Sequence, residues 1–183
     1  MTVIGVISDT HIFDSGKRKV PQAVFDLFRS EGVSLILHGG DLVAWSVIEE
    51  LEQIAPVQAV RGNNDPASYG LPLQRRVEVE GLVIGLAHGD VGRTGREKSL
   101  PGIKGNGITA AAALSHFEFD EDVSCIVFGH SHNPLSHPIQ HGGREILLFN
   151  PGSPTDRRYS SHFGCGILRV DGDQLSAKLV LWD

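Results

Sequence analysis

The chain has 183 residues, 40% of them hydrophobic, and a formal net charge of -6. This length and composition predict one domain over residues 1–183 with a sizeable core, and the negative charge argues against nonspecific affinity for nucleic acid or anionic membranes. With two cysteines, the sequence excludes a disulfide framework and a cysteine-rich zinc site.

The first third of the chain predicts parallel strands connected by helices. Residues 2–7, 33–41 and 56–60 are short apolar runs typical of buried strands. Residues 21–30 and 42–54 carry apolar side chains at helical spacing and predict the two connecting helices. Because parallel strands with crossover helices end on one edge of the sheet, the polar residues that follow these strands should lie close together.

Each of these strands is followed by a polar cluster. The sequence reads Asp-Thr-His at 9–11, Gly-Gly-Asp at 39–41 and Asn-Asn-Asp at 63–65. Gly39 and Gly40 allow a backbone turn that a Cβ would obstruct, so Asp41 can point out of the sheet edge toward a site. Taken alone, an Asp-x-His pair is explained equally well by capping, and an Asn-Asn-Asp run more often forms a turn.

The second half of the chain predicts a second group of strands. These strands are expected at 75–80, 82–87, 123–128, 138–140, 145–149, 164–170 and 174–181. Gly81 marks a hairpin between the first two, and an alanine-rich run at 108–117 predicts a helix. Two packed sheets with outer helices accommodate these elements best.

The segment 91–107 has no apolar period and contains four basic residues. It is longer than a usual structureless connection, which favours a lid or a specificity element, although a mobile surface insert explains it equally well. Its positive charge within an acidic chain could steer a phosphorylated substrate toward the site.

Five strands in all are followed by groups that can bind a divalent metal. These groups are Asp9, His11, Asp41, Asn63, His88, His130 and His132. Oxygen and imidazole ligands without thiolate fit manganese, iron, zinc or nickel better than calcium. Two carboxylates leave excess positive charge on two divalent ions, and a bound phosphate would neutralise it. The set of ligands therefore points to phosphoryl chemistry.

The motifs Asp-x-His, Gly-Gly-Asp, Gly-Asn-x-Asp, His-Gly and Gly-His-Ser-His occur in this order, followed by Asn-Pro-Gly-Ser at 150–153. They resemble the calcineurin-like metallophosphoesterase superfamily, and most of all its small prokaryotic phosphodiesterase branch. The resemblance implies an α/β (α+β) fold, a four-layer αββα sandwich of two mixed β-sheets flanked by helices. It assigns one metal to Asp9, His11, Asp41 and His132, and the other to Asp41, Asn63, His88 and His130.

A centre of this kind implies hydrolysis of phosphodiesters, or of monoesters, by in-line attack of a hydroxide that bridges two divalent ions, with Mn²⁺ expected first and Fe, Zn or Ni as alternatives. Family phosphatases usually carry a histidine where this chain has Asn64. An amide donates a hydrogen bond but gives up no proton, so a general acid must come from elsewhere or be absent. Asp65 either orients a ligand such as His11 or anchors the turn.

A noncatalytic binding scaffold of the same fold is the alternative, and a scaffold is free to lose metal ligands. A single-strand nuclease is disfavoured because the aromatic content is 7% and the net charge is negative. We expect a cytoplasmic protein with a small phosphorylated substrate, since the sequence begins without a basic leader and no apolar stretch approaches the roughly 20 residues that span a bilayer. The sequence leaves the oligomeric state open.

Overall fold

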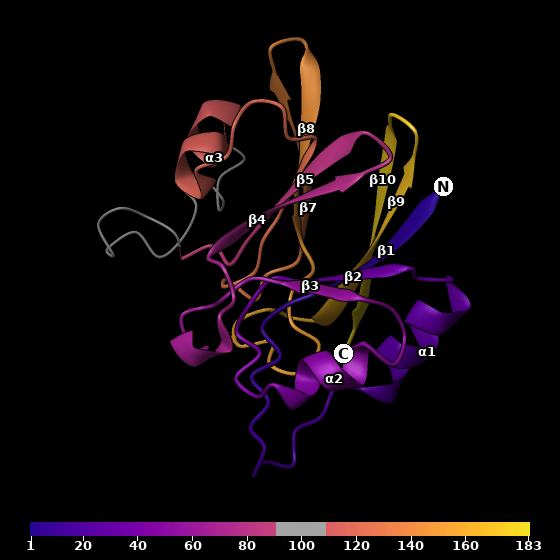
Figure 1. The fold of residues 1–183 in the computed structure, drawn as a ribbon, viewed down its shortest axis with the longest axis vertical. Coiled ribbons are helices and arrows are strands. Elements are labelled where there is room, and N and C mark those ends of the chain that lie inside the picture. Colours follow the sequence, from indigo (N-terminus) through magenta and orange to yellow (C-terminus); the bar gives the residue numbers. More distant parts are fainter. Residues whose placement is uncertain (91–108) are drawn as a thin grey trace.

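A computed structural model describes residues 1–90 and 109–183 (Figure 1). The predicted lid at 91–107 and the first residue of the predicted helix at 108–117 therefore lie outside the described residues. The described residues form two five-stranded sheets, three α-helices and a short 3-10 helix. None of their helices has the length and apolarity that a membrane span requires.

The first sheet has the strand order β10-β9-β1-β2-β3. Its strands are β1 (Thr2–Ile7), β2 (Leu35–His38), β3 (Val57–Ala59), β9 (Phe163–Asp171) and β10 (Gln174–Trp182). The first three run parallel, with α1 (Gln22–Ser30) and α2 (Ser46–Leu51) as their connections, while β9 and β10 run antiparallel to their neighbours. The predicted parallel unit is therefore present.

The second sheet has the strand order β4-β5-β6-β8-β7. Its strands are β4 (Gln74–Val79), β5 (Leu82–Ala87), β6 (Cys125–Val127), β7 (Leu135–His141) and β8 (Arg144–Asn150). The inner pairs β5·β6 and β6·β8 are parallel, and both outer strands are antiparallel to their neighbours. A 3-10 helix η1 (Ala67–Tyr69) precedes β4, and α3 (Ala110–Phe117) precedes β6.

Three hydrophobic layers join the sheets and helices. Phe28 of α1 and Leu51 of α2 pack on the outer face of the first sheet. Leu37 and Phe149 belong to the layer between the two sheets, and Phe117 of α3 packs on the outer face of the second. Figure 1 accordingly shows α1 and α2 on one side of the molecule and α3 on the other. The predicted four-layer αββα sandwich is confirmed.

Most elements differ from their predicted bounds at one end or both; the strands predicted at 33–41 and 123–128, for example, span Leu35–His38 and Cys125–Val127. Two of the differences have clear physical reasons. The helix predicted at 42–54 begins at Ser46, because Val43 has φ of 72° and its N–H binds Asp65 instead of continuing a helix. The strand predicted at 138–140 extends over Leu135–His141, and Pro138 is tolerated because β7 is an edge strand whose neighbour lies on one side.

Hydrogen bonds between the loops at the carboxyl ends of the strands link neighbouring strands within each sheet, and one of them joins the two sheets. The loop after β1 binds the loop after β2, through Asp9 N–H and the Gly40 carbonyl at 2.9 Å. The loop after β6 binds both β5 and β1: Gly129 N–H donates to the His88 carbonyl at 2.9 Å, and His130 N–H donates to the Asp9 carboxylate at 2.9 Å. This edge therefore brings together the ends of both sheets.

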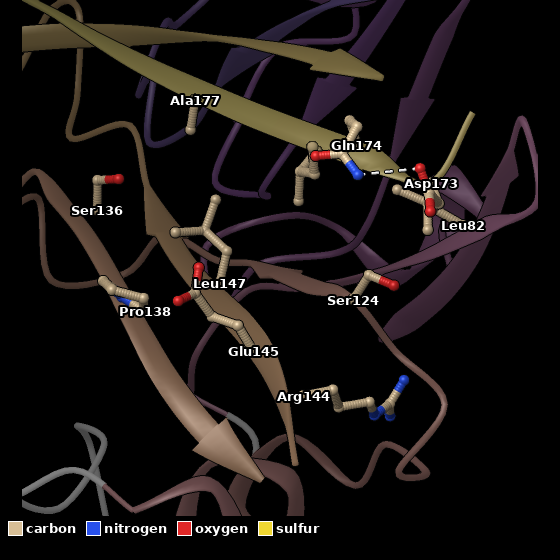
Figure 2. A pocket seen from close by; sticks show the side chains of 11 residues that line it. Leu82, Ser124, Ser136, Pro138, Arg144, Glu145, Leu147, Asp173, Gln174 and Ala177 are labelled. Atoms are coloured by element: carbon tan, nitrogen blue, oxygen red, sulfur yellow. Dashed lines mark hydrogen bonds between the residues drawn. The ribbon is translucent and has the colours of Figure 1, made fainter. Parts of the chain in front are cut away.

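A cavity of about 520 Å³ opens elsewhere between the sheets (Figure 2). Its lining includes Leu82, Arg144 and Gln174, the first residues of β5, β8 and β10. None of the seven candidate ligands lines this cavity. This cavity is therefore separate from the candidate ligands, which follow the carboxyl ends of β1, β2, β3, β5 and β6.

Candidate metal centre

Three of the candidate ligands form a first group at the ends of β1 and β6. His11 Nε2 lies 3.2 Å from His132 Nε2, and His132 Nε2 lies 3.5 Å from Asp9 Oδ1. All three side chains are buried, and their ligand atoms lie within 4.8 Å of one another. This is a compact set of one carboxylate and two imidazoles.

A second group lies beside the first, at the ends of β3, β5 and β6. Asn63 Oδ1 lies 3.2 Å from His88 Nε2 and 3.0 Å from His130 Nδ1. The carboxylate of Asp41 lies between the groups, with Oδ2 3.5 Å from His11 Nε2 and 3.4 Å from His88 Nε2. The structure thus brings all seven predicted residues together, with Asp41 shared between two sets.

The spacing of these atoms suits bound cations. Ligands at about 2.1 Å from a metal lie roughly 3.0 to 3.4 Å apart in octahedral or tetrahedral geometry. The separations of 3.2 Å between His11 and His132 and 3.2 Å between Asn63 and His88 fall in that range. The donor set, two carboxylates with an amide and four imidazoles, therefore fits borderline divalent ions in both geometry and type.

The backbone at the centre is held in conformations that L residues rarely adopt. Five of the seven candidate ligands have positive φ, namely Asp9 (55°), His11 (43°), Asp41 (56°), His130 (65°) and His132 (57°). Such residues cost of order 1–3 kcal/mol each and cluster at functional sites, where the surrounding structure fixes them. Strain at five ligands in three different loops therefore marks this edge as a site rather than a set of ordinary strand ends.

Glycines permit the close approach of these loops. A Cβ on Gly40, which has φ of 92°, would lie 2.8 Å from His88 Nδ1, and a Cβ on Gly62 would lie 2.2 Å from Asp41 Oδ1. Larger residues at either position would displace a candidate ligand. The predicted role of Gly40 in turning the chain at Asp41 agrees with this geometry.

Two histidines have their tautomers fixed by backbone carbonyls, which can only accept hydrogen bonds. His88 Nδ1–H donates to the Gly39 carbonyl at 2.7 Å, and His132 Nδ1–H donates to the Asp156 carbonyl. The Nε2 atom of each ring therefore faces the candidate centre, and it presents a lone pair there whenever the ring is neutral. Metal-binding histidines are usually oriented by the same kind of bond through their other nitrogen.

Burial shifts the protonation of the candidate ligands. It raises the pKa of Asp9 to about 7 and lowers the pKa of His132 to about 4. Burial would also lower the pKa of His88, but the hydrogen bond with Asp41 and the charge of Asp9 raise it to about 9. In turn, the hydrogen bond and charge of His88 hold the pKa of Asp41 below its usual range, although burial acts in the opposite direction. Without a metal, protons must balance the buried carboxylates, so divalent cations would replace them favourably.

Asn64 and Asp65 are both bonded to the Asp41 region. Asn64 donates to Asp41 twice, from its backbone N–H to Oδ1 at 2.8 Å and from Nδ2 to Oδ2 at 2.6 Å. Asp65 accepts the backbone N–H groups of Asp41, Val43 and Gly62, each at 2.8 Å. Asp65 thus anchors the turn and also holds the backbone of the candidate ligand Asp41, whereas in the described part of the chain it forms no hydrogen bond with His11.

The structure also reveals supporting residues to which the sequence assigned no role. Ser153 Oγ–H donates to the Asp9 carbonyl at 2.7 Å and accepts the N–H of Asp156 at 2.9 Å, and the Asp156 carbonyl fixes His132. Asn150 Nδ2 donates to the Gly129 carbonyl at 2.8 Å. The Asn-Pro-Gly-Ser motif was the available signal for this loop, whereas the Asp156 carbonyl is a backbone group that no sequence pattern distinguishes.

His38, at the end of β2, supports a prediction about acid stability. It is fully buried, and its Nδ1 accepts the N–H of Gly40 at 3.1 Å. Burial lowers the pKa of His38 from 6.5 to about 3, so between these values the unfolded chain binds one more proton than the folded protein and the free energy of unfolding falls as pH drops. Between pH 7 and pH 5 this single group should lower the free energy of unfolding by about 2 kcal/mol.

The measurement is urea unfolding of metal-free protein at pH 7 and pH 5. His38→Asn keeps an acceptor for Gly40 but cannot take up a proton, so its loss of stability over this pH interval should be about 2 kcal/mol smaller than in the wild type. His141→Asn is the matched control, since it makes the same replacement at a partly exposed histidine on the edge strand β7, away from the candidate centre. Equal pH dependence in His38→Asn and wild type would contradict the prediction.

Comparisons with known proteins agree with a metal centre at this site, because the similar proteins include a probable metallophosphoesterase. Residues 1–173 match the family model described as the calcineurin-like phosphoesterase superfamily domain. A probable metallophosphoesterase of Methanothermobacter thermautotrophicus is 38% identical over 180 residues, covering 97% of this chain and 91% of that protein. A phosphodiesterase of Methanocaldococcus jannaschii is 40% identical over 163 residues, covering 81% of this chain and 82% of that protein.

Solved structures share the fold. The zinc complex of Vps29 from Entamoeba histolytica has a TM-score of 0.70 at 21% identity and covers 98% of this chain and 99% of that one. A structure described as a novel archaeal phosphodiesterase has a TM-score of 0.64 at 20% identity and covers 98% of this chain and 100% of that one. The family model over residues 1–173 and the Methanothermobacter thermautotrophicus relative, which covers 97% of the chain, place this protein in the calcineurin-like phosphoesterase superfamily.

Proposed function

We propose that this protein is a metal-dependent phosphodiesterase whose seven gathered side chains hold two divalent ions. The observation that carries the proposal is the position of Asp41 Oδ2, within 3.5 Å of His11 in one set and 3.4 Å of His88 in the other. A carboxylate shared in this way is what a two-metal site requires. The named activity of the Methanocaldococcus jannaschii relative supports the choice of phosphodiesters.

Two bound divalent ions would supply Lewis acidity toward the phosphoryl oxygens and a water of lowered pKa. The chain's own residues set where this happens. Asn64 donates to Asp41 Oδ2, which holds the shared carboxylate between the two ligand sets. Carbonyl partners keep His88 and His132 in the tautomer that presents Nε2 to the centre.

The chemistry of Asn64 restricts the substrates. Its amide can hold a carboxylate or a phosphoryl oxygen, but it cannot protonate a leaving alkoxide, and general acid catalysis is worth about 10²–10⁴-fold. We therefore propose that diesters with good leaving groups are the better substrates. The net charge of -6 and the aromatic content of 7% favour a small phosphorylated molecule over a nucleic acid strand.

Mn²⁺ is the ion that we propose first, with Fe, Zn or Ni as alternatives, because the ligand set mixes oxygen and imidazole donors. We also propose a cytoplasmic location. Cys125 and Cys165 are both free and buried, which suits a reducing compartment.

The prediction for activity concerns metal removal. EDTA treatment followed by gel filtration should abolish hydrolysis of bis(p-nitrophenyl) phosphate, and Mn²⁺ should restore it, because the seven side chains provide ligands but no acid or base that replaces the ions. The same assay with p-nitrophenyl phosphate tests monoesters. Full activity in the stripped protein would contradict the proposal.

A noncatalytic binding scaffold remains the second candidate, because side chains that hold ions can serve recognition without turnover. Metal titration followed by turnover separates the two functions. A scaffold would bind ions without hydrolysing either ester, whereas an enzyme would bind about two ions per chain and gain activity in step with the second.

A further inference from the structure

Two adjacent arginines in the loop between β8 and β9 point in different directions. The Arg157 guanidinium lies over the ring of Phe163, 5.3 Å from its centroid, and donates to the Ser161 carbonyl at 3.1 Å. Arg158 instead places Nη2 3.4 Å from His11 Nε2. The backbone of Arg158 has φ of 45°, and Ser160 N–H donates to the Arg157 carbonyl at 2.7 Å. Both arginines therefore lie in one tight turn, where one side chain enters packing and the other reaches the candidate centre.

Among the described residues, no carboxylate lies within 4.0 Å of the Arg158 guanidinium, so its positive charge has no ion-pair partner there. Arg18, which also lies near this loop, differs because Asp156 Oδ2 accepts from its Nη1 at 3.3 Å. A cation beside His11 would be repelled by divalent ions bound to the same ring, since like charges a few Å apart repel strongly where the effective dielectric is low. An anion between them removes this repulsion.

We infer that Arg158 binds a non-bridging oxygen of the substrate's phosphoryl group and holds it against the metal centre, an assignment that rests on the proposed function. A guanidinium offers planar, paired N–H donors that match phosphate oxygens. Its positive charge would stabilise the negative charge that spreads over the equatorial oxygens in the transition state. Arg157 cannot serve because its side chain is committed to Phe163 and Ser161.

Binding of inorganic phosphate to the Mn²⁺-loaded protein tests this inference without turnover. By isothermal titration calorimetry, Arg158→Ala should bind phosphate at least about 10-fold more weakly than wild type, and Arg158→Lys should fall between them because it keeps the charge without the paired donors. The matched control Arg157→Ala should stay within about twofold of wild type.

Mn²⁺ affinity separates this role from a structural one. Because Arg158→Ala removes a cation beside the metal ligands, Mn²⁺ should bind as tightly as in wild type or more tightly, while phosphate binds more weakly. If both affinities fall in parallel, Arg158 acts by positioning His11 and the inference is wrong. Unchanged phosphate affinity in Arg158→Ala would also overturn it.

Turnover of the chromogenic diester should fall about 10²-fold in kcat/KM for Arg158→Ala, and the deficit should appear in kcat as well as KM. Failure of the inference is distinct from failure of the proposed function. An active wild type with an equally active Arg158→Ala overturns only the inference. A wild type that binds phosphate through Arg158 but hydrolyses no ester overturns only the proposed function.

Discussion

Asp41→Asn is expected to lower kcat/KM for the chromogenic diester on the order of 10³-fold, about 4 kcal/mol of transition-state stabilisation. Asp41 is the residue whose Oδ2 lies between His11 and His88 and so contacts both ligand sets. An amide has no negative charge to place between two divalent ions. The number of Mn²⁺ ions bound per chain, measured after equilibrium dialysis, should therefore fall below two along with the activity.

The replacement should leave the fold intact, because the Asn carbonyl can still accept the N–H of Asn64, which reaches Asp41 Oδ1 at 2.8 Å. Circular dichroism and thermal unfolding check this point. Asp26→Asn provides the matched control, since Asp26 lies on the exposed side of α1 and accepts from Gln22. Full activity with two bound ions in Asp41→Asn would refute the shared-carboxylate centre.

The elements that the sequence predicts best are the strands buried in the layers. Thr2–Ile7 and Leu82–Ala87 have the bounds expected from their apolar runs, because strands covered on both sides require continuous apolar sequence. The same reasoning placed polar residues at the ends of parallel strands. The gathering of the candidate ligands at one edge follows from that topology and not from any single motif.

The parts that could not be predicted are those set by backbone conformation. Residues 42–45 carry helical spacing, yet the φ of 72° at Val43 and its bond to Asp65 keep them out of α2. Arg157 and Arg158 are identical in type, and the conformation of the turn that contains them decides which one faces His11. Local apolar patterning carries no information about such turns, which depend on contacts between loops far apart in sequence.

Asp65 shows how the strain at the centre is maintained. The left-handed conformations of Asp41 and Val43 need a fixed partner, and the buried carboxylate of Asp65 supplies it by accepting N–H groups from both residues. These two bonds tie the turn to the loop that carries Asn63, and a third bond, from Gly62 N–H to Asp65, closes that loop on itself. One side chain that binds no metal in the proposed scheme therefore fixes the loops of two candidate ligands.

Asp65→Ala should accordingly destabilise the protein by about 3–5 kcal/mol, because it leaves three N–H donors without their acceptor and each unsatisfied buried donor costs about 1–3 kcal/mol. For a chain of this size the loss corresponds to a fall in Tm of about 10 °C. Asp26→Ala, on the exposed side of α1, should shift Tm by about 2 °C or less. At temperatures where Asp65→Ala remains folded, Mn²⁺ should bind about 10- to 100-fold more weakly, since groups that orient metal ligands have effects of this size. A large fall in Tm with unchanged Mn²⁺ affinity would show that Asp65 stabilises the turn without positioning Asp41.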